Sequence, residues 1–126
     1  RWAAEQAALH AAPLRVVHAW QPSPLVPPGH RAARDRSTLE QAAHAVLDDC
    51  VTRGLPARGL AEVTLDTRLA FGGPAQSLLA EAADARLLVL GARGHGGFAG
   101  LLLGSVAHQC VHHARCPVAV IPDPVR

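Results

Sequence analysis

Four segments of the chain have the residue spacing and composition of helices. In segment 31–53, apolar residues recur three and four positions apart, and Gly54 follows as a stop. Segment 1–12 is rich in alanine, the best helix former, and ends before Pro13. A third helix begins at Gly73-Pro74, with proline at its first position and Leu78, Leu79 and Ala82 directed inward, and a fourth spans 105–114.

Shorter apolar segments between these helices have the features of strands. Segment 14–20 is β-branched and ends at a proline-rich stretch, while 60–69 alternates apolar and polar residues, which predicts a strand near a sheet edge. Leu87 to Leu90 is a continuous apolar run, typical of a strand buried on both faces at the centre of a parallel sheet. Segment 117–122 is a last strand with proline at both ends. The alternation predicts an α/β fold, an open parallel sheet with helices on both faces.

Length and composition limit the classes of protein to which the chain can belong. At 126 residues, with 49% apolar and 17% charged residues, we expect a single folded domain over 1–126. The net charge is only +2 and the arginines are scattered, so we expect neither nucleic acid nor a membrane surface as partner. No apolar stretch approaches the roughly 20 residues that span a bilayer. Three cysteines without a secretory signal indicate a cytoplasmic protein.

A glycine-rich loop between the apolar run and the fourth helix is the most informative segment. The predicted strand ends at Gly91, and Gly104-Ser105 opens the helix. Glycines let a ligand approach the backbone, and the free N–H groups of a helix start attract anions, so this pattern predicts a phosphate site. The alternative is a flexible connection in which Ser105 is an ordinary N-cap. Gly94, Gly96 and Gly97 do not give the G-x-G-x-x-G fingerprint in the right strand context. A P-loop is also missing, because the chain has no lysine.

The spacing of this loop matches another template. Two residues separate Gly91 from Gly94, and nine residues separate Gly94 from Gly104-Ser105. This spacing resembles the G-x2-G-x9-G-[ST] motif of the universal stress protein family. The resemblance extends over the chain: 1–3 resembles the first helix of that family, 14–20 its second strand, 73–75 the turn into its third helix, and 116–122 its last strand. It implies a Rossmann-like, adenine nucleotide alpha hydrolase-like fold.

The resemblance also implies an adenine nucleotide, ATP or cyclic AMP, with or without Mg²⁺, bound by a stress-response regulator. No catalytic residue and no structural metal are expected, and slow ATP hydrolysis is the most turnover that we expect. The apolar last strand, Val118 to Ile121, is expected to pair with its twofold mate in a homodimer, with a regulatory protein partner of unknown identity. The alternative is a dimerising protein-interaction module of the same fold that binds no nucleotide. Carried over by position, the implied nucleotide-binding residues are Ala19, Leu90, Gly91, Gly94, Gly104, Ser105 and Val106, with Arg93 and His95 as candidate phosphate contacts.

The resemblance further implies a first strand, followed by a nucleotide-contacting aspartate, ahead of the first helix. The chain begins within that helix, so we expect both to be missing and the domain to be N-terminally truncated. Because the family places this strand between its second and fourth strands, its absence leaves a gap of about one strand spacing, 4.8 Å, or a re-paired sheet.

Other chemically suggestive residues have a simpler interpretation. Segment 110–116 holds two cysteines and two histidines, but on a helix Cys110 and His113 share one face while His112 does not, and Cys116 lies beyond the helix end. A buried cysteine with surface histidines is the favoured interpretation. His18 is interpreted as a core histidine of its strand, and Ser105 lacks the G-x-S-x-G context of a nucleophile.

Overall fold

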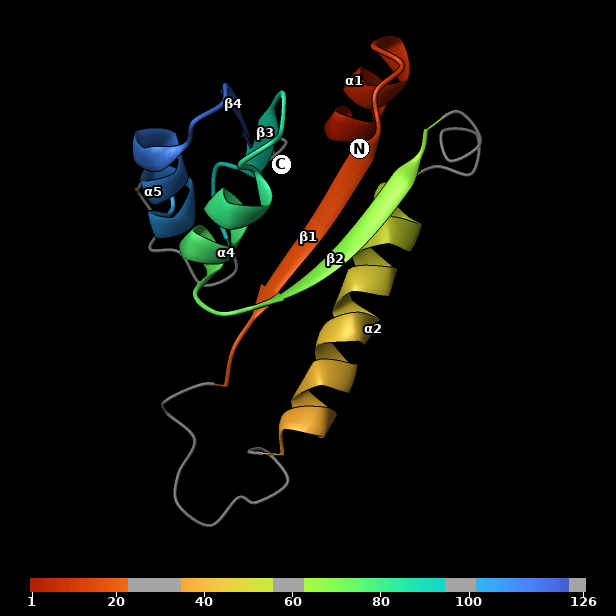
Figure 1. Cartoon of the computed structure of the whole chain (residues 1–126), viewed down its shortest axis with the longest axis vertical. Helices are drawn as coiled ribbons and strands as arrows, with labels where there is room; N and C mark the ends of the chain where they lie inside the picture. Colours follow the sequence, from red (N-terminus) through yellow and green to blue (C-terminus); the bar gives the residue numbers. More distant parts are fainter. Residues whose placement is uncertain (23–34, 56–62, 95–101, 123–126) are drawn as a thin grey trace. The chain divides into compact units, whose positions relative to one another are not determined.

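Helices and parallel strands alternate along the chain, as the pattern predicts for an α/β fold. The computed structural model describes residues 1–22, 35–55, 63–94 and 102–122. In these ranges the fold class is confirmed (Figure 1). The elements are α1 (Trp2–Leu9), β1 (Leu14–Trp20), α2 (Arg36–Gly54), β2 (Leu65–Phe71), α4 (Pro74–Glu81), β3 (Leu88–Gly91), α5 (Ser105–His113) and β4 (Val118–Ile121).

Several element boundaries differ from the predictions. The first helix, predicted over 1–12, ends at Leu9, with His10 as its C-cap. Gly54 does not stop α2 but is its last residue, and Leu55, with extended backbone, caps the helix. The strand predicted over 60–69 begins at Leu65 and continues to Phe71. Gly72 follows the strand, and its φ of 142° is a conformation that favours glycine. Because ladder pairing with β1 selects the paired residues, apolar alternation alone did not locate either end of β2.

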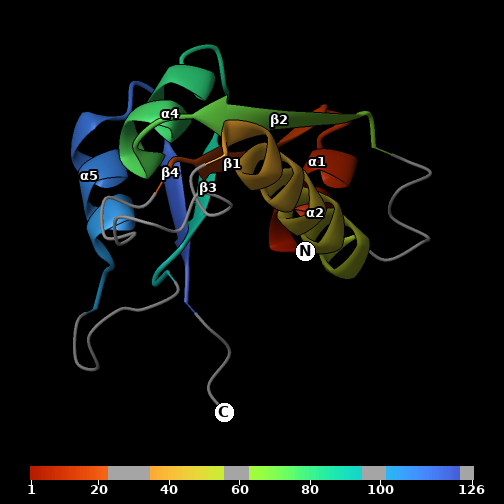
Figure 2. The same ribbon diagram turned by 90° about the horizontal axis from the view of Figure 1, so that it is seen from below.

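Residues 1–72 form one compact unit, built on a β–α–β crossover. β1 and β2 pair in parallel from Leu14 opposite Leu65 to Trp20 opposite Phe71. α2 runs antiparallel to the two strands and packs along them (Figures 1 and 2). At its start, the carboxylate of Asp35 accepts hydrogen bonds from the hydroxyls of Ser37 and Thr38 at 2.6 and 3.1 Å. The buried residues of this unit are Ala4, Ala7, Trp20, Ala43, Leu47 and Leu55.

Residues 73–126 form the second unit, which repeats the crossover in a smaller form. β3 and β4 pair in parallel from Leu88 opposite Val118 to Gly91 opposite Ile121, and α5 connects them. α4 begins with Pro74 at its first position after Gly73, as predicted, and packs on α5. Of the three residues predicted to face inward from this helix, Ala82 is buried, and Leu78 and Leu79 are half-buried. The buried residues of the unit are Ala75, Ala82, Ala92, Ala107 and Cys110.

The predicted position of the apolar run at the centre of one sheet is wrong. Among the described residues β3 pairs with β4 alone, and the strands form two separate two-stranded sheets, β1-β2 and β3-β4. Leu88 to Leu90 are half-buried rather than buried, and Leu87 lies outside the strand with 38% of its surface exposed. An apolar run shows that a strand favours burial, but neighbouring elements decide whether it is buried. The sequence analysis expects either a gap or a re-paired sheet in place of a missing middle strand. Among the described strands, neither β1 nor β2 pairs with β3 or β4, so no re-paired sheet forms.

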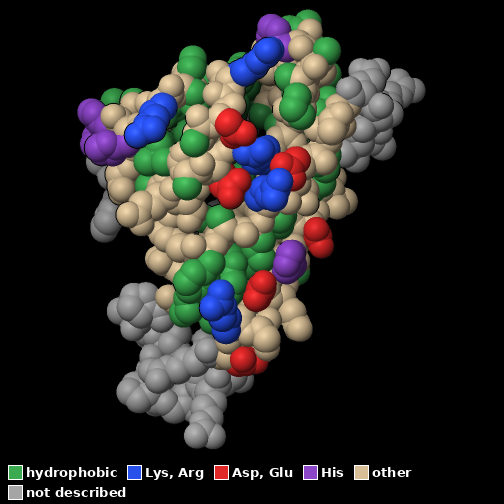
Figure 3. Space-filling model, viewed as in Figure 1, with side chains coloured by type: hydrophobic (Ala, Val, Ile, Leu, Met, Phe, Trp, Pro, Cys, Tyr) green, Lys and Arg blue, Asp and Glu red, His purple; other side chains and the backbone are tan. Residues whose placement is uncertain are grey.

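Charged side chains lie on the surface of the first unit in mixed groups. Asp66 accepts hydrogen bonds from the Nε atoms of Arg15 and Arg68, both at 3.1 Å. Figure 3 shows basic and acidic side chains interspersed over the face in view, with no large area of one sign. In the ranges that the structure describes, every helix is too short or too polar to cross a membrane.

Candidate functional site

The end of β3 and the start of α5 are held together through one residue, Ala92. Its backbone N–H donates to the carbonyl of Ile121 at 2.8 Å, and its own carbonyl accepts the N–H of Gly104 at 2.7 Å. Ala92 is buried, with 9% of its surface exposed. It therefore connects the tip of β3, the end of β4 and the N-terminus of α5. The sequence carries no signal for this role beyond the position of Ala92 between two glycines.

This connection brings two of the predicted glycines together. A Cβ built on Gly104 would lie 3.5 Å from the backbone nitrogen of Gly94 and 3.5 Å from the Cα of Arg93. At the strand end, a Cβ on Gly91 would lie 3.3 Å from the carbonyl oxygen of Arg93, which is closer than most side chains tolerate. Gly91, Gly94 and Gly104 thus form one cluster at the carboxyl end of β3, where α/β sheets bind ligands.

Nothing in the described part of the chain requires glycine at position 94. Among the glycines that the structure describes, only Gly72 has a positive φ, so backbone strain does not select glycine at 94. A Cβ on Gly94 would meet no atom within 4 Å. A side chain would fit there without disturbing the fold. Open space beside the backbone at 94 is what a bound molecule needs in order to approach the chain closely.

The N-terminus of α5 lies at this cluster and presents backbone N–H donors to it. The first turn of the helix holds no acidic residue that would repel an anion. Gly104 is the N-cap, with φ −70° and ψ 162°, and no side chain caps the helix. Helix geometry leaves the N–H groups of Ser105, Val106 and Ala107 without intrahelical acceptors. The alternative in which Ser105 caps the helix is wrong: Ser105 is the first helical residue, and it is exposed. Such an end can accept an anion.

The other residues predicted to bind the nucleotide are divided between the two units. Leu90 and Val106 are half-buried in the second unit, at the end of β3 and the start of α5. Arg93 is exposed next to Gly94, whereas His95 lies outside the described residues. Ala19 is in the first unit, on β1 opposite Ala70. Ala19 and the glycine cluster belong to different units, so a joint role for them in binding one nucleotide stays a prediction.

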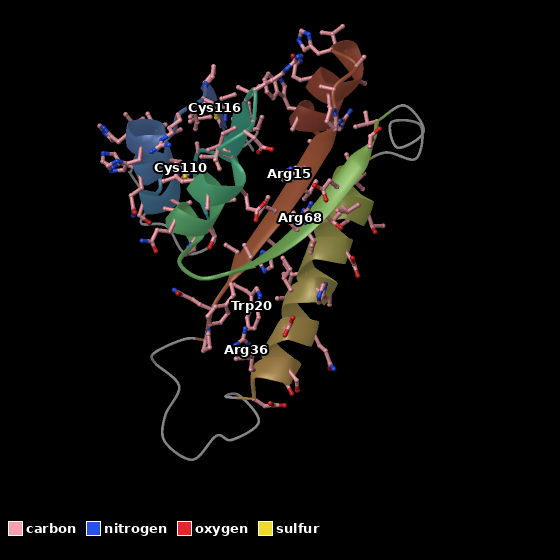
Figure 4. All side chains as sticks on the ribbon, viewed as in Figure 1. Arg15, Trp20, Arg36, Arg68, Cys110 and Cys116 are labelled. Atoms are coloured by element: carbon pink, nitrogen blue, oxygen red, sulfur yellow. The ribbon has the colours of Figure 1, made fainter. Side chains whose placement is uncertain are left out.

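The cysteines and histidines of α5 follow the interpretation made from the sequence. Cys110, labelled on α5 in Figure 4, is fully buried in the second unit, while His112 and His113 are exposed. Burial raises the pKa of the Cys110 thiol, which keeps the sulfur protonated and a poor metal ligand. Within the described part of the chain, no group of three or more His, Cys, Asp or Glu residues is placed to hold a metal ion.

Comparison with known proteins identifies the family. The family model described as the universal stress protein family matches residues 1–122. The universal stress protein Rv2623 of Mycobacterium tuberculosis is 33% identical over 132 residues, which covers 98% of this chain and 42% of the relative. The chain therefore spans less than half the length of that relative. The chain belongs to the universal stress protein family.

Solved structures share the fold. Universal stress protein UspA from Lactobacillus plantarum superposes with a TM-score of 0.76 and 26% identity, covering 95% of this chain and 84% of that one. A universal stress protein in complex with cAMP gives a TM-score of 0.62 at 23% identity, covering 98% and 86%. A family member from Arabidopsis thaliana with AMP bound gives 0.53 at 20% identity, covering 98% and 77%. Some structural neighbours thus bind adenine nucleotides.

Proposed function

We propose that this chain is an adenine-nucleotide-binding regulatory domain that takes ATP or cyclic AMP at the glycine cluster. The observation that carries the proposal is the meeting of Gly94 with Gly104 at the start of α5, with open space at Gly94. Two structural neighbours that share the fold hold cAMP and AMP, which supports the same ligand class here.

The residues present suit the parts of a nucleotide. The N–H groups that begin α5 and the hydroxyl of Ser105 would hold phosphate oxygens, because they donate from the positive end of a helix dipole. Gly91 and Gly94 let the ribose and phosphates approach the backbone, while Leu90 and Val106 supply apolar walls. Arg93 and His95 would add cationic or donor contacts to phosphate, and Mg²⁺ would balance its charge. Ala19 would meet the adenine through its backbone.

Binding rather than turnover is the proposed activity. Ser105 stands at a helix start in Leu103-Gly104-Ser105-Val106-Ala107, without the sharp strand–helix elbow of a nucleophile. No acid–base partner for Ser105 can be assigned from the sequence spacing. The ligand would thus act by shifting the population of conformations, which needs only a difference in affinity between them.

Calorimetric titration of the purified chain tests the proposal. ATP, with and without Mg²⁺, and cyclic AMP are added in separate titrations, and guanosine triphosphate serves as the control for base recognition. We expect saturable heat with at least one adenine nucleotide and weaker or no binding of the guanine nucleotide. Absence of heat, and of thermal stabilisation, with every adenine nucleotide would refute the proposal.

A second candidate, dimerisation through β4, is supported by a separate observation. In the order β3-β4, the other edge of β4 has no partner among the described strands, and all four of its residues are half-exposed. An exposed apolar edge strand is a ready template for pairing with a second copy. This candidate and nucleotide binding are distinguished by sedimentation of the chain with and without ATP, since pairing through β4 needs no nucleotide.

A further inference from the structure

His108 and His112 lie one turn apart on α5, and both side chains are exposed. The rings of His108 and His112 have centroids 4.6 Å apart and planes tilted by 54°. Figure 3 shows histidine side chains gathered on the surface where α5 lies in Figure 1. The zinc interpretation rejected from the sequence used residues 110–116 and did not include His108.

The spacing of this pair suits one shared metal ion. Residues four apart lie on the same side of a helix, with Cβ atoms roughly 5–6 Å apart. Imidazole nitrogens bind Zn²⁺ at about 2.0–2.1 Å, so two of them on one ion stand about 3 Å from each other. Because χ2 of histidine is a broad torsion, rings with centroids at 4.6 Å can turn one nitrogen each toward a common ion. Paired histidines at this spacing are the helical half of known zinc motifs.

The neighbours of the pair decide which kind of metal site it is. His113 is one position further on, which turns it about 100° around the helix from His112. Cys110 is fully buried, so its sulfur is not accessible to an ion at the surface of the helix. Since no third His, Cys, Asp or Glu completes a group in the described residues, water would fill the remaining positions. Gln109 stands where helical zinc proteases carry a general-base glutamate, so hydrolysis is not inferred.

We propose that His108 and His112 form a two-histidine surface site for a late divalent transition ion. Imidazole ligands favour Cu²⁺, Ni²⁺ and Zn²⁺ over Mg²⁺ or Ca²⁺, and Cu²⁺ binds the most tightly in that series. An ion held by histidines on adjacent turns of α5 binds the folded helix more tightly than the unfolded chain, because only the helix holds the two rings side by side. It therefore stabilises the second unit by RT ln(1 + c/Kd), where c is the ion concentration, and this grows with the logarithm of c once c exceeds Kd. Neither histidine is among the residues proposed to hold the nucleotide.

Titration of the untagged full chain with Ni²⁺, Zn²⁺ or Cu²⁺ alone tests this site. His108→Gln and His112→Gln remove one ligand each, and His113→Gln is the matched control, because it removes an equally exposed histidine of the same helix. We expect one ion bound per chain, at least tenfold weaker binding in either pair variant, and unchanged binding in the control. Far-ultraviolet circular dichroism verifies that each variant keeps its helices.

The outcomes separate the site from general histidine binding. If His113→Gln weakens metal binding as much as His108→Gln does, the ion is not held by His108 and His112, and the proposal is overturned. Equal affinity in wild type and in the double variant His108→Gln/His112→Gln overturns it as well, since other histidines would then hold the ion. A rise in the unfolding temperature with Ni²⁺ in the wild type and in His113→Gln, lost in both pair variants, supports it.

Discussion

Trp20 and Phe71 lie opposite one another at the last paired position of β1 and β2. Their ring centroids are 5.1 Å apart with planes at 75°, an edge-to-face contact. Trp20 is buried, while Phe71 has 54% of its surface exposed and carries the guanidinium of Arg36 at 4.7 Å above its ring. Figure 4 shows Trp20 and Arg36 at the same end of the unit. The contact thus joins both strands to the first turn of α2.

We predict that Phe71→Ala lowers the free energy of unfolding by about 1 kcal/mol, because the aromatic pair and the cation–π contact are both lost. Phe71→Leu keeps apolar contact with Trp20 but no ring, so about half of that loss is expected. Urea unfolding followed by tryptophan fluorescence measures both. Leu9→Ala, at a residue with 74% of its surface exposed, is the control. A Phe71→Ala chain that unfolds at the wild-type urea concentration would contradict the prediction.

Asp66 makes stability depend on pH in the acid range. Partial desolvation raises the pKa of its carboxyl, but hydrogen bonds and charge from Arg15 and Arg68 outweigh that effect, so the pKa lies below the ordinary 3.8. A lowered folded-state pKa contributes stability above pH 3.8, and this contribution is lost as pH falls through the folded-state pKa.

Carboxyl carbon shifts measured by NMR against pH test this prediction. We expect Asp66 to titrate below 3.8, and Arg68→Gln to move its titration upward. A titration midpoint at or above that value in the wild type would show that the two arginines do not hold the charge.

Gly94 and Gly54 form a matched pair for testing the nucleotide site, because an added Cβ meets nothing within 4 Å at either position. Gly94→Ala is expected to weaken ATP or cyclic AMP binding at least tenfold, or about 1.4 kcal/mol, by occupying the space of the ligand. Gly54→Ala, at the end of α2, should leave affinity unchanged. Calorimetry measures affinity, and thermal unfolding verifies the fold of each. If Gly94→Ala binds the nucleotide with wild-type affinity, Gly94 is not part of the binding site.

We predict that a charge on β4 prevents the proposed pairing of two chains through this strand. Val118→Lys places a cation on the edge strand, where the proposed mate would pair, and is expected to yield monomers in sedimentation velocity. Val111→Lys, at an exposed valine of α5, is the control and should leave the association state unchanged. A wild type that is monomeric at every concentration tested, or a Val118→Lys dimer, would count against pairing through β4.

The thiols should differ in reactivity with an aromatic disulfide reagent at neutral pH. Cys50 is exposed on α2 and is expected to react within the mixing time, whereas Cys110 is fully buried, with its pKa raised by burial. Cys110 should react only as fast as the second unit opens. Mass spectrometry of the labelled chain identifies the sites. Rapid labelling of Cys110 in the Cys50→Ser variant would contradict its burial.

Much of the fold could be predicted because local rules act within each element. Pro74 at the first position of α4 and the glycine-bounded run before Gly91 depend on backbone conformation alone. The ends of α2 and β2 could not be located in this way. Gly54 tolerates helical conformation, and the start of β2 depends on its ladder with β1. The glycine spacing predicted a site at the start of α5, but not the role of Ala92, whose hydrogen bonds come from residues distant in sequence.

The sequence by itself determined the family, the α/β alternation and the glycines of the candidate site, because spacing and propensity are properties of neighbouring residues. Only the tertiary structure decided that β3 pairs with β4 alone among the described strands, that Gly104 caps α5 in place of Ser105, and that Trp20 meets Phe71. These relationships depend on hydrogen bonds and contacts between segments far apart in the chain. No local pattern encodes which strand edge is filled or which atoms surround an open position such as Gly94.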